Sequence, residues 1–290
     1  MDQYIDAFIT YLQEVKHASS NTVQAYLNDL KRLELYLRKQ NITTVTKISE
    51  TGLNSYVLSM EKDGLSPASV SRNIASMRAF ILYLLKHGAI SGDPLERMKP
   101  PKVIKKFPQI IEASFVDILL QQPNLDTRKG LRDKAMLELL YATGIKVSEL
   151  ITLKLSNINL NGRFITCGER ERNIPFGRMA KTALEDYLNI RLEAFPDKDN
   201  PILFLNSSGG QLTRQGFWKI LKAYANTAGI PNMNPNMIRR SFAAHLIDNG
   251  ADLESVREFL GHTDIATTQL YIPRSYKSSR EVYMNTHPRA

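Results

Sequence analysis

The chain has 290 residues, of which 43% are hydrophobic and 23% charged, and its formal net charge is +9. This balance is typical of a globular protein with room for one large core or two modest ones, and no apolar run is long enough to span a bilayer. Cys167 is the only cysteine, which excludes an internal disulfide and a cysteine-built zinc site and favours a reducing, cytoplasmic compartment.

The positive charge favours a phosphate-rich partner, because Lys and Arg side chains that neutralise phosphates release condensed counterions. Charge alone is equally compatible with a generally basic protein.

Residues 1–92 carry helical periodicity, and we expect four or five short helices packed as a bundle. Ser66 and Pro67 form an N-cap and a first-turn proline, which predicts a helix that ends near Gly88. An earlier helix is expected to be capped by Ser20 or Asn21. Its apolar residues share one face: Val23, Leu27, Leu30, Leu33 and Leu37.

Residues 93–109 are predicted to be a linker, because prolines at 94, 100, 101 and 108 prevent a continuous helix. Its cations are Arg97, Lys99, Lys102, Lys105 and Lys106. The prolines and the single sign of charge favour a strap that lies along a phosphate backbone over a plain interdomain connection.

Residues 110–290 are predicted to form a second domain in which helices dominate. Between Asn161 and Phe176 the pattern changes to two short apolar runs around a polar turn, which predicts a β-hairpin or a three-stranded sheet. Further helical segments are expected around 178–194, 212–228, 236–249 and 252–260.

Two long strings in this half carry a resemblance to a known family. RDKAMLELLYATGIKVSELITL, residues 132–153, resembles the first conserved box of the tyrosine recombinases, the phage integrase family. NPNMIRRSFAAHLIDNGADLESVREFLGHTDIATTQLY, residues 234–271, resembles the second box, in which a tyrosine follows Leu-Gly-His at an interval of nine residues. The N-terminal half has the core-binding layout of the same family, and the final His-Pro-Arg-Ala resembles the end of its Xer members.

The resemblance implies a mainly α fold. An N-terminal SAM-like bundle would be followed by a mostly helical catalytic domain with a small antiparallel sheet. It also implies that residues 272–290 form a final helix that docks into a neighbouring protomer. A helix folded back on its own domain is the alternative.

The resemblance further implies a catalytic set without metal or cofactor. Tyr271 would attack a DNA phosphodiester and form a phosphotyrosine, while Arg239 and His262 would stabilise charge on the phosphate oxygens. Glu149 would orient a neighbouring cation.

Three positions depart from the family pattern. Lys146 replaces the first arginine and lacks its planar fork. Asn236 replaces a histidine and cannot carry a proton near neutral pH. Cys167 replaces the lysine that acts as general acid, and Arg170, three residues later, is a candidate substitute, although a guanidinium is a reluctant proton donor.

These features give three hypotheses. The first is a site-specific recombinase or integrase that acts on double-stranded DNA and associates there with a second copy of itself or with a second recombinase. The second is a catalytically impaired relative that binds DNA as a partner, regulator or architectural factor. The third is a plain helical DNA-binding protein. In each case Arg72 and the five linker cations are candidate DNA contacts.

Overall fold

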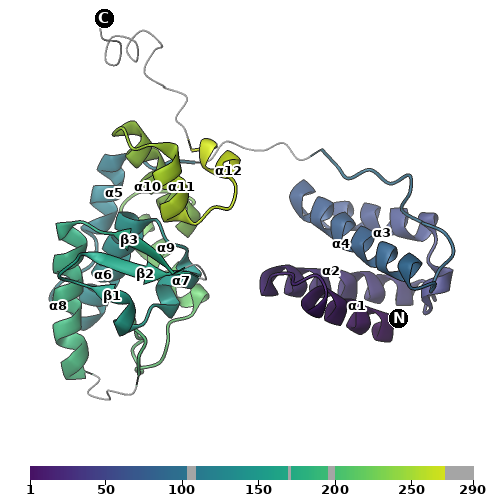
Figure 1. Cartoon of the computed structure of the whole chain (residues 1–290), viewed down its shortest axis with the longest axis horizontal. Coiled ribbons are helices and arrows are strands. Elements are labelled where there is room, and N and C mark those ends of the chain that lie inside the picture. The colour runs from purple at the N-terminus through teal and green to yellow at the C-terminus, as the bar shows by residue number, and fades with distance from the viewer. Residues whose placement is uncertain (103–108, 169–170, 195–199, 272–290) are drawn as a thin grey trace, which may run out of the picture. The chain divides into compact units, whose positions relative to one another are not determined.

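The computed structural model describes residues 1–102, 109–168, 171–194 and 200–271. The chain divides into two compact units, Met1–Lys106 and Phe107–Ala290. Both are mainly helical, and the second contains the only sheet of the described residues (Figure 1). The expected fold class is therefore confirmed.

The described residues of the N-terminal unit form four α-helices and a short 3-10 helix, Val45–Lys47. The α-helices are α1 (Asp2–Glu14), α2 (Ser20–Lys39), α3 (Glu50–Lys62) and α4 (Pro67–Lys86). Ser66 caps α4 as predicted, because its hydroxyl accepts a hydrogen bond from the Ser69 N–H at 3.2 Å. The predicted cap of α2 was wrong by one residue: the side chain of Ser19 accepts from the Thr22 N–H at 3.2 Å, and Ser20 is already helical.

The core of this unit forms where the apolar faces of its helices meet. Phe8, Leu30, Tyr56 and Phe80 are almost fully buried there. Leu95 and Met98 join the same core, so the first part of the predicted linker packs against the bundle. Arg78 holds it there by donating to the Met98 carbonyl at 2.7 Å.

The second unit is built around α6 (Arg128–Thr143), whose residues 135–137, 139 and 140 have no exposed surface. Helix α8 (Arg178–Ala194) packs along α6 (Figure 1). The other helices are α5 (Ala113–Leu120), α7 (Val147–Thr152), α9 (Arg214–Thr227), α10 (Pro235–Asp248), α11 (Leu253–Leu260) and α12 (Ile265–Gln269), with a 3-10 helix at Leu155–Asn157. Helix α12 was not predicted.

The sheet of this unit has three antiparallel strands in the order β1 (Ile158–Asn159), β2 (Phe164–Cys167) and β3 (Arg172–Pro175). Of the two predicted possibilities, the three-stranded sheet is therefore the one observed. The register pairs Cys167 with Arg172 at the end of the β2–β3 hairpin, which brings both side chains to the site described next.

Candidate active site

Arg239 on α10 lies at the centre of the site and is only 6% exposed. Its guanidinium donates to the carbonyl of Gly144 at 2.6 Å and to that of Leu260 at 2.6 Å. These carbonyls end α6 and α11, where glycines at 144 and 261 have left-handed backbone conformations. Carbonyls at helix C-termini lack intrahelical donors and carry partial negative charge. Arg239 therefore joins the two helix ends at one point.

His262 follows the end of α11 and contacts the same guanidinium. Its Nε2 lies 3.2 Å from Arg239 Nη2, and its Nδ1 lies 3.0 Å from the hydroxyl of the buried Thr268. Burial, and then the charges of Arg239 and Lys146, lower the pKa of His262 to about 4. The imidazole is therefore neutral at pH 7, with Nε2 accepting from Arg239 and Nδ1 donating to Thr268.

Tyr271 lies beside His262, with ring centroids 6.0 Å apart. Its N–H donates to the Thr268 carbonyl at 2.9 Å, one turn back in the chain. The ring packs on a small apolar cluster that includes Phe242 and Leu260. Thr268 thus bonds to both the imidazole and the tyrosine backbone, so α12, which sequence reasoning missed, positions the tyrosine.

Lys146 and Cys167, which depart from the family pattern, belong to the same cluster. The positive charges of Lys146 and Arg239 act to lower the pKa of both His262 and Cys167. Lys146 is exposed at the start of α7, where its N–H donates to Glu149 Oε2 at 2.8 Å. Cys167 is only 7% exposed, and burial together with the Glu149 carboxylate raises the pKa of its thiol to about 11. The thiol is therefore protonated and uncharged at neutral pH.

Asn236 and Arg170 are the remaining predicted positions. Asn236 is exposed in the first turn of α10, three residues before Arg239, a spacing at which side chains share a helix face. Arg170 lies outside the described residues.

Arg172 is a site residue that sequence reasoning missed. Its Nη2 donates to Glu149 Oε1 at 2.9 Å and lies 3.8 Å from the sulfur of Cys167. The cation that Glu149 was expected to orient is therefore Arg172. A Cβ atom at either Gly168 or Gly261 would collide with this guanidinium. The arginine is thus enclosed between the hairpin and the end of α11.

A cleft of about 490 Å³ opens beside this ion pair, between α7 and the hairpin. Its lining residues are Ser148, Glu149, Thr152, Leu153, Lys154, Asn157, Thr166, Cys167, Gly168 and Glu171. Within the described ranges there is no cluster of three or more His, Cys, Asp or Glu side chains that could hold a metal ion. The functional groups that meet in this cluster are a phenol, an imidazole and guanidinium groups.

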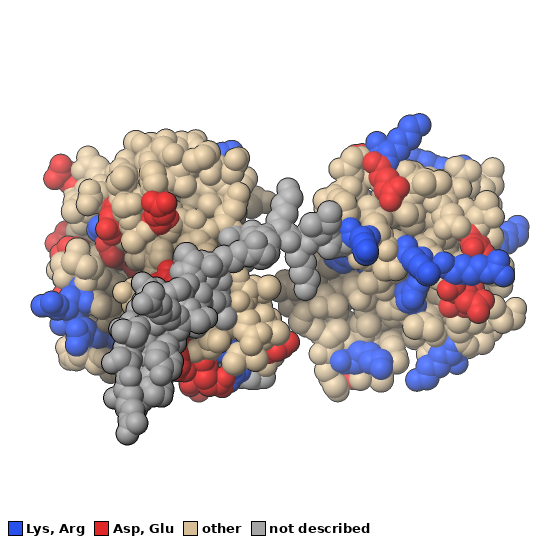
Figure 2. Space-filling view, turned by 90° about the horizontal axis from the view of Figure 1, so that it is seen from above, with Lys and Arg blue, Asp and Glu red and all other residues tan. Residues whose placement is uncertain are grey.

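The predicted DNA contacts of the N-terminal unit have different surroundings. Arg72 forms an ion pair with Asp29, whereas Arg97, Lys99 and Lys102 are exposed. Lys105 and Lys106 lie outside the described residues. On the face drawn in Figure 2, Lys and Arg side chains are spread over this unit and cover more of it than the acidic side chains do. In the part of the chain that the structure covers, no helix is both long and apolar enough to cross a membrane.

Comparisons with known proteins match both units. Residues 110–278 match the phage integrase family, and residues 5–88 match the phage integrase N-terminal SAM-like domain. Tyrosine recombinase XerD of Listeria innocua is 41% identical over the full length of both chains. Tyrosine recombinase XerC of Roseiflexus sp. is 39% identical over all of this chain and 95% of its own.

Two solved structures share the fold. XerH site-specific recombinase bound to difH substrate, a pre-cleavage complex, has a TM-score of 0.71 at 21% identity, covering 98% of this chain and 84% of its own. A lambda integrase dimer bound to a COC' core site has a TM-score of 0.74 at 13% identity, covering 96% and 97%. The family models and the full-length relatives together show that the chain belongs to the phage integrase family of tyrosine recombinases.

Proposed function

We propose that this chain is a site-specific DNA recombinase that cleaves and rejoins double-stranded DNA through a phosphotyrosine at Tyr271. The observation that carries the proposal is the convergence of Arg239, His262 and Tyr271 on the joined ends of α6 and α11. The relatives named XerD and XerC, and the DNA-bound structures of XerH and lambda integrase, support it.

In the cleavage step the Tyr271 oxygen attacks phosphorus, and the bond from phosphorus to the 5′-oxygen breaks. A 3′-phosphotyrosine forms and the leaving strand takes a proton to become a 5′-hydroxyl. The tyrosine proton passes to a base or to water. Negative charge that builds on the nonbridging oxygens is stabilised by Arg239, because preorganised charged donors are strongest in a buried site.

His262 acts beside Arg239 in this step. In the free protein its Nε2 accepts a hydrogen bond from Arg239. A phosphate that takes over the guanidinium donors frees Nε2, and the added negative charge favours the protonated imidazole. His262 can then donate to the phosphate. Ligation reverses the sequence, with the 5′-hydroxyl attacking phosphorus and Tyr271 leaving.

The protonation of the leaving oxygen is the step that the substitutions affect most. Cys167 carries a buried, uncharged thiol, which is a weak donor. Loss of a general acid costs on the order of 10²–10⁴ in rate. The second candidate function is therefore a cleavage-impaired protein that binds recombination sites beside an active partner, and the neutral thiol at Cys167 is the observation that favours it.

We further propose that two protomers bind each DNA site and contact one another through residues 272–290. Those residues lie outside the described part of the chain. The proposal is supported by the lambda integrase structure, which is a dimer on its core site, and by the resemblance of the chain terminus to that of Xer proteins.

Covalent trapping tests the proposed function. Duplex sequences that the chain selects from randomised DNA would be rebuilt with a nick beside the scissile phosphate, so that the cleaved fragment diffuses away. A DNA-linked band on a denaturing gel, absent with Tyr271→Phe, is the expected result. Binding without any such band would refute cleavage by this chain.

A triple variant separates the two candidate functions. Lys146→Arg, Asn236→His and Cys167→Lys together restore the family residues. If the wild-type chain forms no adduct and this variant does, the substitutions impair cleavage in an intact binding protein. If both form adducts at similar rates, other side chains have replaced the missing groups.

A further inference from the structure

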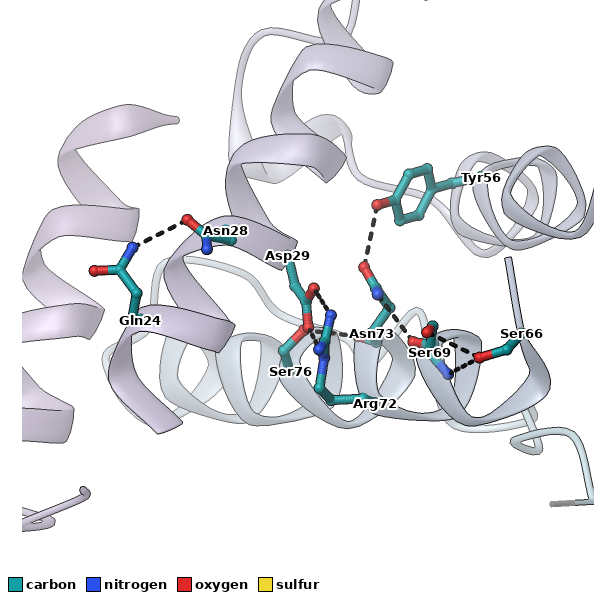
Figure 3. Close-up of polar contacts among 9 residues, drawn as sticks. All are labelled: Gln24, Asn28, Asp29, Tyr56, Ser66, Ser69, Arg72, Asn73 and Ser76. Atoms are coloured by element: carbon teal, nitrogen blue, oxygen red, sulfur yellow. Dashed lines mark hydrogen bonds and ion pairs between the residues drawn. The ribbon is translucent and has the colours of Figure 1, made fainter. Parts of the chain in front are cut away.

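Arg172 and Glu149 form an ion pair in which both side chains are withdrawn from solvent. The side chain of Arg172 on β3 is 12% exposed and that of Glu149 on α7 is 13% exposed. The Arg72–Asp29 pair of the N-terminal unit differs, because its arginine is 52% exposed and only its carboxylate is buried (Figure 3). Taking both charges of a pair out of water is costly, so the Arg172–Glu149 pair is more than a surface contact.

The hydrogen bonds of this pair are incomplete. Arg172 Nη2 donates to Glu149 Oε1 at 2.9 Å, but Arg172 Nε is buried without a hydrogen-bond partner among the described residues. An unpaired buried donor lowers stability. Buried ion pairs add little net stability and can instead fix one conformation. The arrangement is therefore better suited to holding a position than to strengthening the fold.

The carboxylate connects the pair to the end of α6. Glu149 Oε2 accepts from the Lys146 N–H at 2.8 Å, two residues after Gly144, whose carbonyl accepts from Arg239. One oxygen of Glu149 thus holds this backbone turn and the other holds Arg172. The guanidinium of Arg172 is therefore fixed relative to the start of α7.

The same guanidinium fills the space between two glycines. A Cβ on Gly261 would lie 2.5 Å from Arg172 Cζ, and a Cβ on Gly168 would collide with Nη1. Gly261 ends α11 directly before His262, and Gly168 follows Cys167 at the end of β2. One planar group therefore contacts both the turn that carries the imidazole and the hairpin end that carries residue 167.

We propose that Arg172 is a positioning residue that holds the end of the β2–β3 hairpin, and with it residue 167, at a fixed place beside the turn of His262. Cys167 and Arg172 are the last pair of the hairpin before its loop, and the ends of such elements open most readily. Without the guanidinium, residue 167 would lose its fixed distance from Arg239. The catalytic meaning of this inference rests on the proposed recombinase function.

The competing explanations are that Arg172 acts only as a charge or only as a source of stability. Cys167 separates them, because it is 7% exposed and lies in the hairpin itself. The thiolate is the reactive form of cysteine, and the positive charge of Arg172 lowers the pKa of the thiol. Loss of the charge alone would leave less thiolate and slow alkylation, whereas release of the hairpin would expose the thiol and accelerate alkylation.

The test is the rate at which iodoacetamide alkylates Cys167 in the native full-length chain at pH 8, followed by mass spectrometry. Arg172→Met keeps a long side chain without the guanidinium and should react roughly 10-fold faster than the wild-type chain, the factor that corresponds to about 1.4 kcal/mol. Arg172→Lys keeps the charge but not the planar fork, and should also react faster. Leu119→Ala is the control for stability, because Leu119 is fully buried on α5, outside the elements that Arg172 joins. Its thiol should stay protected below the melting temperature.

Cleavage supplies a second measurement. Under the proposed function, Arg172→Met should lower the rate of adduct formation on saturating duplex by up to about 10²-fold, because a small misplacement of a reacting group can cost that much. The affinity for the duplex should stay the same, whereas a residue needed only for folding would lower affinity and rate together. The comparison is made in the wild-type chain or, if that forms no adduct, in the triple variant that restores the family residues.

An unchanged or slower alkylation in either Arg172 variant would overturn the inference, because the hairpin would then keep its place without the guanidinium. So would an equal acceleration in Leu119→Ala, which would trace the exposure to a general loss of stability. If Arg172→Met does not fold, Arg172→Lys decides by the same measurement. If neither the wild-type chain nor the triple variant forms an adduct, the proposed cleavage fails, whereas the thiol measurement needs no DNA and still decides whether Arg172 holds the hairpin.

Discussion

Replacement of Arg239 by methionine should both destabilise the second unit and raise the pKa of His262. The variant keeps a long side chain in a position that is 6% exposed, but leaves the carbonyls of Gly144 and Leu260 without this donor. An unsatisfied buried polar group costs about 1–3 kcal/mol, so two carbonyls cost about 2–6 kcal/mol. Relief of the buried charge offsets part of this. We expect a lower melting temperature; before this offset the loss corresponds to about 4 °C or more, since 1 kcal/mol corresponds to about 2–4 °C at this size.

The same substitution removes a guanidinium from His262 Nε2, which lies 3.2 Å away. Burial is the largest cause of the low pKa of His262, and Arg239 is the next. The pKa should therefore rise from about 4 without reaching its ordinary value of 6.5. It can be followed by the NMR titration of the imidazole resonances.

Arg257→Ala is the matched control for this titration. Arg257 donates to the His262 carbonyl at 2.9 Å, but it is the last of the charges that lower the imidazole pKa. Its removal should move the pKa less than that of Arg239. An unchanged His262 titration in the Arg239 variant, or a larger shift in the control, would refute the electrostatic account of the site.

Three further predictions follow from the same residues. Because the folded-state pKa of His262, about 4, lies below its ordinary 6.5, the unfolded chain binds an extra proton between these values. Stability should therefore be full above pH 6.5 and fall as the pH drops toward 4, and urea unfolding of His262→Asn should show a shallower decline. Gly261→Ala should lower the melting temperature more than Gly250→Ala. Both have positive φ, but only at Gly261 would a Cβ meet Arg172, so equal effects would place Arg172 elsewhere. The Cys167 thiol, 7% exposed with a pKa raised to about 11, should resist alkylation at pH 8 until the chain is unfolded in urea; rapid labelling of the native chain would contradict its burial.

The resemblance to the family's second box indicated the candidate site residues that lie within one segment, His262 and Tyr271. Leu260-Gly261-His262 places an imidazole directly after a left-handed helix end, and the interval to Tyr271 spans one short helix. Helical periodicity likewise predicted the bundle and the helices around the sheet. The helix α12 escaped detection because Ile265–Gln269 is only five residues long, too short to display an amphipathic period.

Pairings between distant segments were beyond such reasoning. Arg172 on β3 pairs with Glu149 on α7, and Arg72 on α4 pairs with Asp29 on α2. In the sequence each of these groups resembles an ordinary surface charge, since nothing local marks its partner. The glycines at 168 and 261 are the one sequence feature tied to Arg172, and their meaning depends on the guanidinium that both face.

The three departures from the family pattern have unequal consequences because they occupy different environments. Lys146 is exposed and keeps its positive charge, so it can still attract a phosphate, though without a planar fork. Asn236 is exposed beside Arg239 on α10 and retains an amide donor. Cys167 differs from both, because it is buried against Arg172 and its thiol stays neutral. A phosphate bound at Arg239 would thus have the cations Lys146 and Arg172 nearby, but no ready proton donor at Cys167. The geometry therefore separates two properties of this chain. Under the proposed function, affinity for a scissile phosphate would depend on the groups that remain charged, whereas the rate at which the 5′-oxygen leaves would depend on Cys167, where the family's lysine is absent.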